Sequence, residues 1–205
     1  MDECFAFGHT AARVCEVFLN GNGRILKKMK DFDNVDRECC EVIEKRIETA
    51  EFVLIGVGKE FQSTGENKEK LLQAYAQLEK LIKGKPYFVV TENEDDVIFE
   101  SELLDFFLAA PFADDSRMQS SEEQWNSYLN WLTATLNHSL CILELGVGFE
   151  TPQVIRWPFE KTAAFNLKSV MIRVNGKFPQ LSKEISERGI SVAQNALDLL
   201  SQWKD

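Results

Sequence analysis

Two short glycine-rich segments, each directly after an apolar run, have the residue types that hold a nucleotide. Gly146-Val-Gly148 follows the run Leu140–Leu145, and Gly56-Val-Gly58 follows Phe52-Val-Leu-Ile55. Glycine allows positive φ and a close approach of the backbone to a ligand, and a helix that starts after such a loop can hold a phosphate. Because neither segment has the third glycine of the full dinucleotide motif, a sharp turn is the alternative interpretation.

Polar side chains follow two further apolar runs. Thr91-Glu-Asn-Glu-Asp-Asp96 and Asn175 each come directly after one. Asn93 and Asp95 could hydrogen-bond a ribose or an amide. The alternative is a solvated acidic turn, because its carboxylates would repel a pyrophosphate. We predict no metal site: a second acidic cluster is missing, and none of the five cysteines forms a Cys-x-x-Cys pair, so we interpret them as reduced thiols in or near the core.

The periodicity of apolar residues places these segments between strands and helices. Short buried runs predict strands near residues 52–56, 87–91, 140–145, 169–174 and 190–192. Helical spacing predicts helices over residues 10–19, 35–47, 68–83, 122–138 and 196–203. After the central strand we predict a helix that Thr151 caps and Pro152 starts, and that Pro158 kinks or restarts.

This alternation predicts an α/β protein. We expect a Rossmann-like open parallel sheet of about five strands, with helices on both faces and a helical lead-in over residues 1–50. In such a sheet the carboxyl ends of all strands lie at one edge, where ligands bind. The two glycine segments, the acidic turn and Asn175 should therefore converge there. The length fits one domain over residues 1–205. The phenylalanine-rich residues 97–121 could form a lid, a buried helix or a protein-binding surface.

The charge balance excludes several classes of partner. The formal net charge is −10, and the clustered Lys and Arg that nucleic acids and anionic membranes require are missing. No apolar stretch reaches the length of a membrane span, and the first residues do not resemble a secretory signal. We therefore predict a cytoplasmic protein without nucleic-acid or membrane partners, and leave a homo-oligomer open.

Three segments together resemble sirtuins, the NAD-dependent protein deacylases and ADP-ribosyltransferases. Thr91-Glu-Asn-Glu-Asp95 looks like the Thr-Gln-Asn-Ile-Asp element of that family. Glu144–Pro152, with Val154–Phe159 after it, is similar to the corresponding late-strand segment of bacterial sirtuin-like proteins. Asn175 is similar to the sirtuin asparagine that contacts the cofactor ribose. The resemblance covers roughly residues 40 to 205, in order.

The resemblance implies a site for NAD or ADP-ribose. Asn93 and Asp95 would face the nicotinamide end as the catalytic candidates. The residues that would contact the dinucleotide are Gly56, Gly58, Gly146, Gly148, Phe149 and Asn175.

The chain also departs from the sirtuin pattern. Lys59-Glu60-Phe61 replaces the small residues of the family's Gly-Ala-Gly-x-Ser loop, and no histidine lies between Asp96 and Asn137, where the family has its general base. The four zinc-binding cysteines are absent, and residues 97–121 stand where that small zinc module would be. Deacylation needs a base for the ribose hydroxyl, whereas ADP-ribosyl transfer can depend more on positioning and charge stabilisation.

Three hypotheses for the function follow. The first is a sirtuin-like protein that binds NAD, ADP-ribose or a related nucleotide, with altered or lost deacylase activity. The second is an active NAD-dependent ADP-ribosyltransferase or deacylase with a dedicated partner protein. The third is a non-catalytic interaction module that uses Phe106, Phe107 and Phe112 as its contact surface. The sequence leaves open whether the protein is an enzyme.

Overall fold

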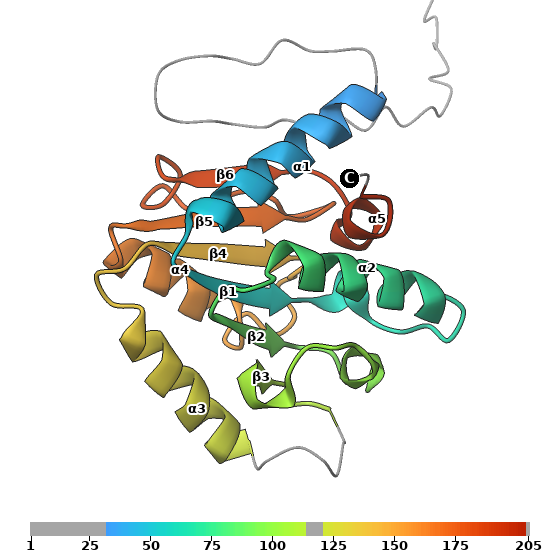
Figure 1. Cartoon of the computed structure of the whole chain (residues 1–205), viewed down its shortest axis with the longest axis horizontal. Coiled ribbons are helices and arrows are strands. Elements are labelled where there is room, and N and C mark those ends of the chain that lie inside the picture. The colour runs from blue at the N-terminus through green and yellow to red at the C-terminus, as the bar shows by residue number, and fades with distance from the viewer. Residues whose placement is uncertain (1–31, 114–120, 204–205) are drawn as a thin grey trace, which may run out of the picture.

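The computed structural model describes residues 32–113 and 121–203, and it shows an α/β fold built on one parallel sheet of six strands (Figure 1). In chain order the elements are α1 (Phe32–Thr49), β1 (Phe52–Val57), α2 (Lys68–Leu81), β2 (Tyr87–Thr91), β3 (Leu108–Ala109), α3 (Ser121–Ala134), β4 (Leu140–Leu145), α4 (Arg156–Phe165), β5 (Ser169–Val174), β6 (Gly189–Val192) and α5 (Ala196–Ser201). Short 3-10 helices lie at Lys59–Phe61, Val97–Glu100 and Asp105–Phe107.

The strands lie in the order β3-β2-β1-β4-β5-β6, so the sheet grows outward from β1 in one direction and then from β4 in the other. This confirms the Rossmann-like α/β prediction, with one strand more than expected. The extra strand, β3, has two residues and pairs with β2 at the edge of the sheet. Two residues are too few to show a strand periodicity. The predicted helix over residues 10–19 lies outside the described residues.

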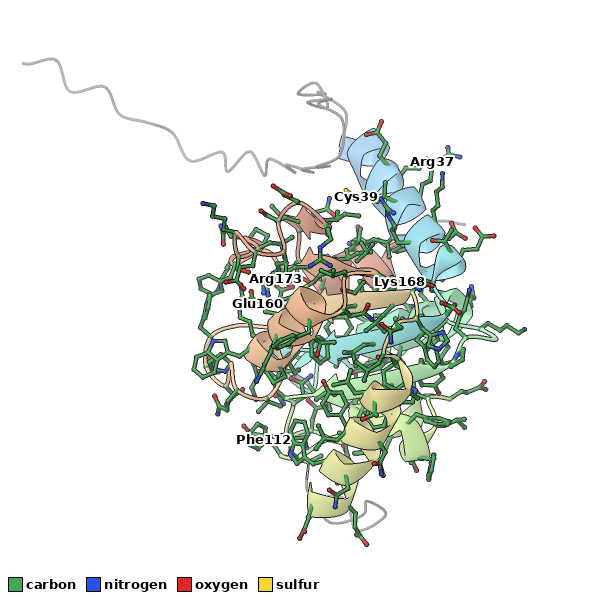
Figure 2. All side chains as sticks on the ribbon, turned by 90° about the vertical axis from the view of Figure 1, so that its left-hand side faces the viewer. Arg37, Cys39, Phe112, Glu160, Lys168 and Arg173 are labelled. Atoms are coloured by element: carbon green, nitrogen blue, oxygen red, sulfur yellow. The ribbon has the colours of Figure 1, made fainter. Side chains whose placement is uncertain are left out.

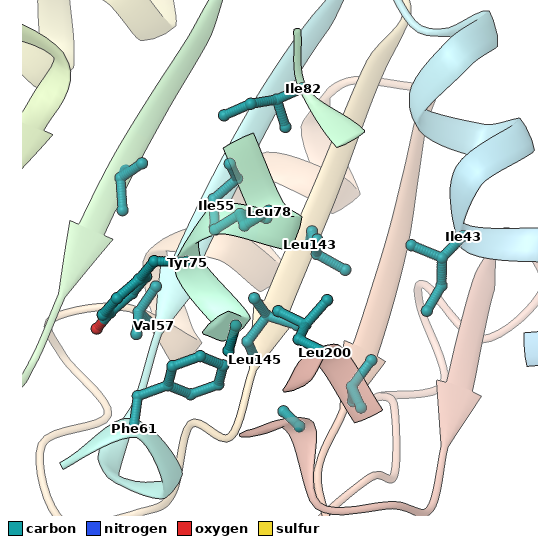
Figure 3. Close-up of a cluster of buried hydrophobic side chains, with 14 of the residues drawn as sticks. Ile43, Ile55, Val57, Phe61, Tyr75, Leu78, Ile82, Leu143, Leu145 and Leu200 are labelled. Atoms are coloured by element: carbon teal, nitrogen blue, oxygen red, sulfur yellow. The ribbon is translucent and has the colours of Figure 1, made fainter. Parts of the chain in front are cut away.

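Helices cover both faces of the sheet, as predicted. One core lies between the sheet and α1, α2 and α5, and the other lies between the sheet and α3 and α4 (Figure 1). Alternation along β1 sends Val53, Ile55 and Val57 into the first core and Leu54 into the second. Figure 3 shows the first core, where side chains of α2 and α5 meet those of β1 and β4. The cysteines of the described part are buried, as expected: Cys39, Cys40 and Cys141.

The helix after β4 begins later than the sequence predicted. α4 starts at Arg156, with Ile155 as its N-cap residue. Thr151 does not cap a helix, because its hydroxyl donates a hydrogen bond to Glu92 Oε2 at 2.7 Å. Pro158 then lies in the first turn of α4, where its missing N–H breaks no hydrogen bond, so it neither kinks nor restarts the helix.

The segment after β2 packs against the sheet edge through its first half. Val97, Ile98, Phe99 and Leu103 are buried in the first core. The second half leaves three large apolar side chains in solvent: Leu104, Phe106 and Phe112, which are 57%, 69% and 42% exposed. In the ranges that the structure describes, no helix is long and apolar enough to cross a lipid bilayer.

Glu51 joins the amino ends of β1 and β4. Its carboxylate accepts hydrogen bonds from the Ser139 amide at 2.8 Å and the Ser139 hydroxyl at 3.0 Å, and His138 Nδ1 lies 3.1 Å from Glu51 Oε1. These bonds, the Ser139 amide first, lower the pKa of Glu51 from its usual 4.5 to about 2.

We expect Glu51→Gln to destabilise the protein at neutral pH but not in strong acid. The folded state keeps the carboxylate ionised down to a pH of about 2, whereas the unfolded chain titrates near 4.5. The stabilisation is therefore complete above the unfolded pKa and is lost as the pH falls through the folded one. Thermal unfolding between pH 7 and pH 2 should show the melting temperatures of parent and variant converging. Glu44→Gln, at an exposed position of α1, serves as the control, and a gap that stays constant with pH would contradict this expectation.

Candidate functional site

The predicted site residues lie at the carboxyl edge of the sheet. The ends of four strands stand in register there: Val57 pairs with Thr91 on one side and with Leu145 on the other, and Leu145 pairs with Val174. The chain leaves β1 toward the face that carries α2, and it leaves β4 toward the opposite face, which carries α4. Open α/β sheets bind their ligands at such a reversal. We call this region the carboxyl edge.

Gly58 and Gly146 bring the loops after β1 and β4 into direct contact. A Cβ at Gly58 would lie 2.4 Å from the Gly146 carbonyl oxygen and from Val147 Cα. Gly146 has a φ of +65°, a conformation that favours glycine. Both glycine amides are already used, because Gly58 N donates to Leu145 O and Gly146 N donates to Val174 O, each at 2.8 Å. These two glycines therefore close the edge between the strands.

Gly56 and Gly148 differ from each other in the space around them. A Cβ at Gly56 would lie 2.5 Å from a methyl carbon of Ile155 and 2.8 Å from the Phe159 ring, so this glycine lets α4 pack closely on β1. Nothing lies within 4 Å of a Cβ at Gly148, which has open space beside it. Of the predicted glycines, Gly148 is the one whose space a ligand could share.

Phe149 is 56% exposed and belongs to a small aromatic cluster at this edge. Its ring meets the Phe178 ring edge-on at 5.2 Å between centroids, and the Arg156 guanidinium lies 4.1 Å from the centroid of Phe149. Arg156 also donates to the Phe178 carbonyl at 3.0 Å. Phe149 thus offers an open aromatic face, backed by a cation, on which a planar group can stack.

Asn175 links the loops after β4 and β5. Its Nδ2 donates to Val147 O at 2.8 Å, and its Oδ1 accepts from the amides of Lys177 at 2.8 Å and Phe178 at 2.7 Å. The side chain is buried. These bonds occupy its amide on both sides, so in this conformation Asn175 holds the loop and presents no free group to a ribose.

Two carboxylates that are not among the predicted site residues lie inside the edge. Glu60 accepts from the amides of Gly176 at 2.9 Å and Ala196 at 2.6 Å. Glu92 is fully buried, and its carboxylate accepts from the Lys59 amide at 3.3 Å and from the Thr151 hydroxyl. A signal for both was present in the sequence, since Glu60 and Glu92 stand where the sirtuin pattern has a small residue and a glutamine.

Asp95 organises the loop after β1. Its Oδ2 accepts from the Ser63 amide and from Gln62 Nε2, both at 2.8 Å, and its Oδ1 accepts from the Val97 amide at 3.2 Å. These three hydrogen bonds occupy both oxygens of the carboxylate, so in this conformation Asp95 holds the loop in place. Within the described ranges, no three side chains of His, Cys, Asp or Glu gather as metal ligands would.

Asn93 is buried with an unsatisfied amide. The residue is 2% exposed, and neither Nδ2 nor Oδ1 has a hydrogen-bond partner. Its amide acts on the Tyr75 hydroxyl. Tyr75 in turn packs on Phe61 in the first core (Figure 3). Burial raises the pKa of the Tyr75 hydroxyl, Asp95 adds to the rise, and the neighbouring Asn93 amide opposes it. The Asn93 amide is therefore close enough to the Tyr75 hydroxyl to lower its pKa as a hydrogen bond would, although neither Nδ2 nor Oδ1 makes a hydrogen bond of good geometry.

A network of buried charges lies between α4 and the strands β4 and β5, next to the carboxyl edge. Arg173 is bidentate to Glu144, at 2.6 Å and 3.0 Å, and also contacts Glu160 at 2.8 Å (Figure 2). Arg156 Nη1 lies 3.5 Å from Glu144 Oε1 and donates to Val147 O at 2.9 Å. Burial raises the pKa of Glu144, and the guanidinium groups of Arg173 and Arg156 oppose the rise. Neither residue is among the predicted site residues, although each is the single charged residue of its apolar strand.

A groove of about 270 Å³ lies at the opposite, amino edge of the sheet and holds none of the predicted site residues. Its lining includes Lys168 and Arg188. Lys168 Nζ donates to Asn137 O at 2.7 Å, and Arg188 donates to Ala163 O and Asn166 O at 3.0 Å and 3.1 Å. These cations satisfy carbonyl groups at and beyond the carboxyl ends of α3 and α4. These two cations are therefore engaged at the ends of α3 and α4.

We expect Arg173→Met to destabilise the protein by about 3–5 kcal/mol, because it leaves the buried Glu144 carboxylate without its bidentate partner. The double variant Glu144→Leu with Arg173→Met should recover part of that loss, because the buried Glu144 carboxylate is then gone, while Arg156 keeps its hydrogen bonds to Val147 O and Phe178 O but loses its contact with Glu144. Chemical denaturation measures both. Arg37→Met, which breaks an exposed pair with Glu41 on α1, should change the stability by less than about 1 kcal/mol. A double variant as unstable as the single one would show that the pair is not the cause.

Comparison with known proteins shows a partial similarity in sequence. Over 88 residues, 43% of this chain, the sequence is 23% identical to a protein named protein ADP-ribosyltransferase from Staphylococcus aureus (strain Mu50 / ATCC 700699). The aligned part is 27% of the length of that protein. No family model matches the chain. Among solved structures, the minimal Ste5 VWA domain subject to autoinhibition by the Ste5 PH domain covers 82% of this chain and 96% of its own, at 13% identity and a TM-score of 0.34, which is too low to support an argument.

Proposed function

We propose that this protein binds NAD, ADP-ribose or a related nucleotide at the carboxyl edge, with altered or lost deacylase activity. The observation that carries the proposal is the buried, unpaired carboxamide of Asn93 at the end of β2. A buried polar group without a well-formed hydrogen bond costs about 1–3 kcal/mol, so a ligand that pairs with the Asn93 amide would recover that cost. The carboxamide of nicotinamide offers both a donor and an acceptor and matches the Asn93 amide.

The strand order and the sequence similarity support the same proposal. Ligands of open α/β sheets bind where the strand order reverses, which here is between β1 and β4. The partial similarity to a protein named as an ADP-ribosyltransferase supports an NAD-using, transferase-like role. We expect the deacylase activity to be altered or lost because the described residues offer no general base at the carboxyl edge like the histidine of sirtuins. In the part of the chain that the structure describes, the one histidine is His138, at the amino edge, and Asp95 is held by three donors.

We expect the purified protein to bind NAD and ADP-ribose in a calorimetric titration. Its melting temperature should rise by roughly 5 °C at a hundredfold excess of ligand over Kd, because the ligand binds the folded state. Asn93→Leu should weaken NAD binding about tenfold and leave ADP-ribose binding unchanged, because ADP-ribose lacks the nicotinamide that would pair with the amide.

Gly148→Val tests the part of the site that NAD and ADP-ribose would share. The new side chain meets no protein atom near its Cβ, so the fold should persist, while the added methyl groups fill the space beside the loop and should abolish binding of both ligands. No heat and no shift with NAD, ADP-ribose or AMP for the parent protein would contradict the proposed function.

A second candidate function, a protein-interaction module, is favoured by the exposed apolar side chains after β2. Phe106 is 69% exposed and stacks edge-on with Phe107 at 5.1 Å, beside exposed Leu104. Apolar side chains that gather in solvent are typical of a contact surface.

For this candidate we expect a dimer in solution that dissociates on Phe106→Asp, because the substitution places a charge in an apolar interface. Light scattering after size-exclusion chromatography measures the mass. Leu136→Asp, at another exposed apolar position beyond the end of α3, is the control and should leave the dimer intact. A parent protein that is monomeric at high concentration would contradict self-association through this surface.

A further inference from the structure

One side chain, Glu60, ties together the ends of four strands. It starts in the loop after β1, and its Cβ would lie 2.4 Å from a Cβ at Gly146 after β4. Its two carboxylate oxygens reach the Gly176 amide after β5 and the Ala196 amide after β6. Gly176 and Ala196 lie 116 and 136 residues after Glu60 in the sequence. This one side chain therefore connects the first strand of the sheet with its last two.

The Glu60 carboxylate takes the place that an anionic ligand group would need. Oxygens of a carboxylate and of a phosphate accept the same charge-assisted hydrogen bonds from backbone amides. Because Glu60 already holds the Gly176 and Ala196 amides, a diphosphate at this edge has to compete with it, and the two negative charges also repel each other.

Burial and a nearby carboxylate act against the ionised form of Glu60. Burial raises the pKa of its carboxyl, Asp198 adds to the rise, and the two amides oppose it. The net direction means that the ionised carboxylate is less stable here than in water. Gly176 and Lys177 beside it are exposed, so the side chain has a short path to solvent.

We propose that Glu60 is an internal latch that closes the carboxyl edge until the nucleotide displaces it, and that this competition sets the affinity for the nucleotide. The inference rests on the proposed function. If only the open fraction of the protein binds, the apparent Kd is the intrinsic Kd divided by that fraction. Removing the carboxylate removes this penalty, so a variant without it binds more tightly.

The test is a calorimetric titration of the parent and Glu60→Ala with ADP-ribose. Loss of two hydrogen bonds to a charged group should tighten binding about tenfold or more. Glu60→Gln keeps the size of the side chain and one acceptor oxygen, so it should fall between the two. It also carries the test if the alanine variant does not fold. Glu66→Ala, an exposed residue that loses the same charge nearby, should bind like the parent.

The outcomes separate the latch from the proposed function. Tighter binding of ADP-ribose by the Glu60 variants than by the parent supports the latch. A parent that binds while folded Glu60→Ala and Glu60→Gln bind equally or more weakly overturns the latch and leaves the nucleotide site standing. No binding by the parent or by either variant overturns both.

Discussion

The buried ion pair between Glu144 and Arg173 fixes the geometry on which the carboxyl edge depends. Charges inside a core are tolerated only when they are paired, so β4 and β5 must keep the register in which these residues face each other. Arg156 joins the same network and holds the Val147 carbonyl, which Asn175 also contacts. The Glu144, Arg173 and Arg156 network therefore positions the loop after β4. The shape of the proposed nucleotide site depends on that loop.

The fold was predictable because its signals are local. Runs of apolar residues and helical stripes place the five longer strands and the helices of the described chain, and their alternation dictates a parallel sheet. The failures have long-range causes. Strand β3 exists only through its pairing with β2. The start of α4 was wrong because Thr151, a good local cap, bonds instead to Glu92, 59 residues away.

The positions of the site residues were predictable, but their contacts were not. Strand ends brought Gly58, Gly146, Asn93 and Asn175 to one edge, as expected from topology. Their hydrogen bonds depend on which side chains of other loops come within contact distance. The spacing of residues in the sequence does not predict these contacts. Gly56 shows the limit well: its lack of a side chain serves helix packing rather than a ligand.

The central place of β1 in the sheet bears on how the chain folds during synthesis. β1 pairs with β2, which follows soon after, and with β4, whose Leu140 pairs with Phe52. A nascent chain that has emerged only as far as α3 therefore leaves one edge of β1 unpaired. Unpaired edges of apolar strands attract other chains, and parallel pairing over long separations forms slowly. Translation that pauses between α3 and β4 thus exposes an aggregation-prone intermediate, whereas a pause after β5 has already covered both edges of β1.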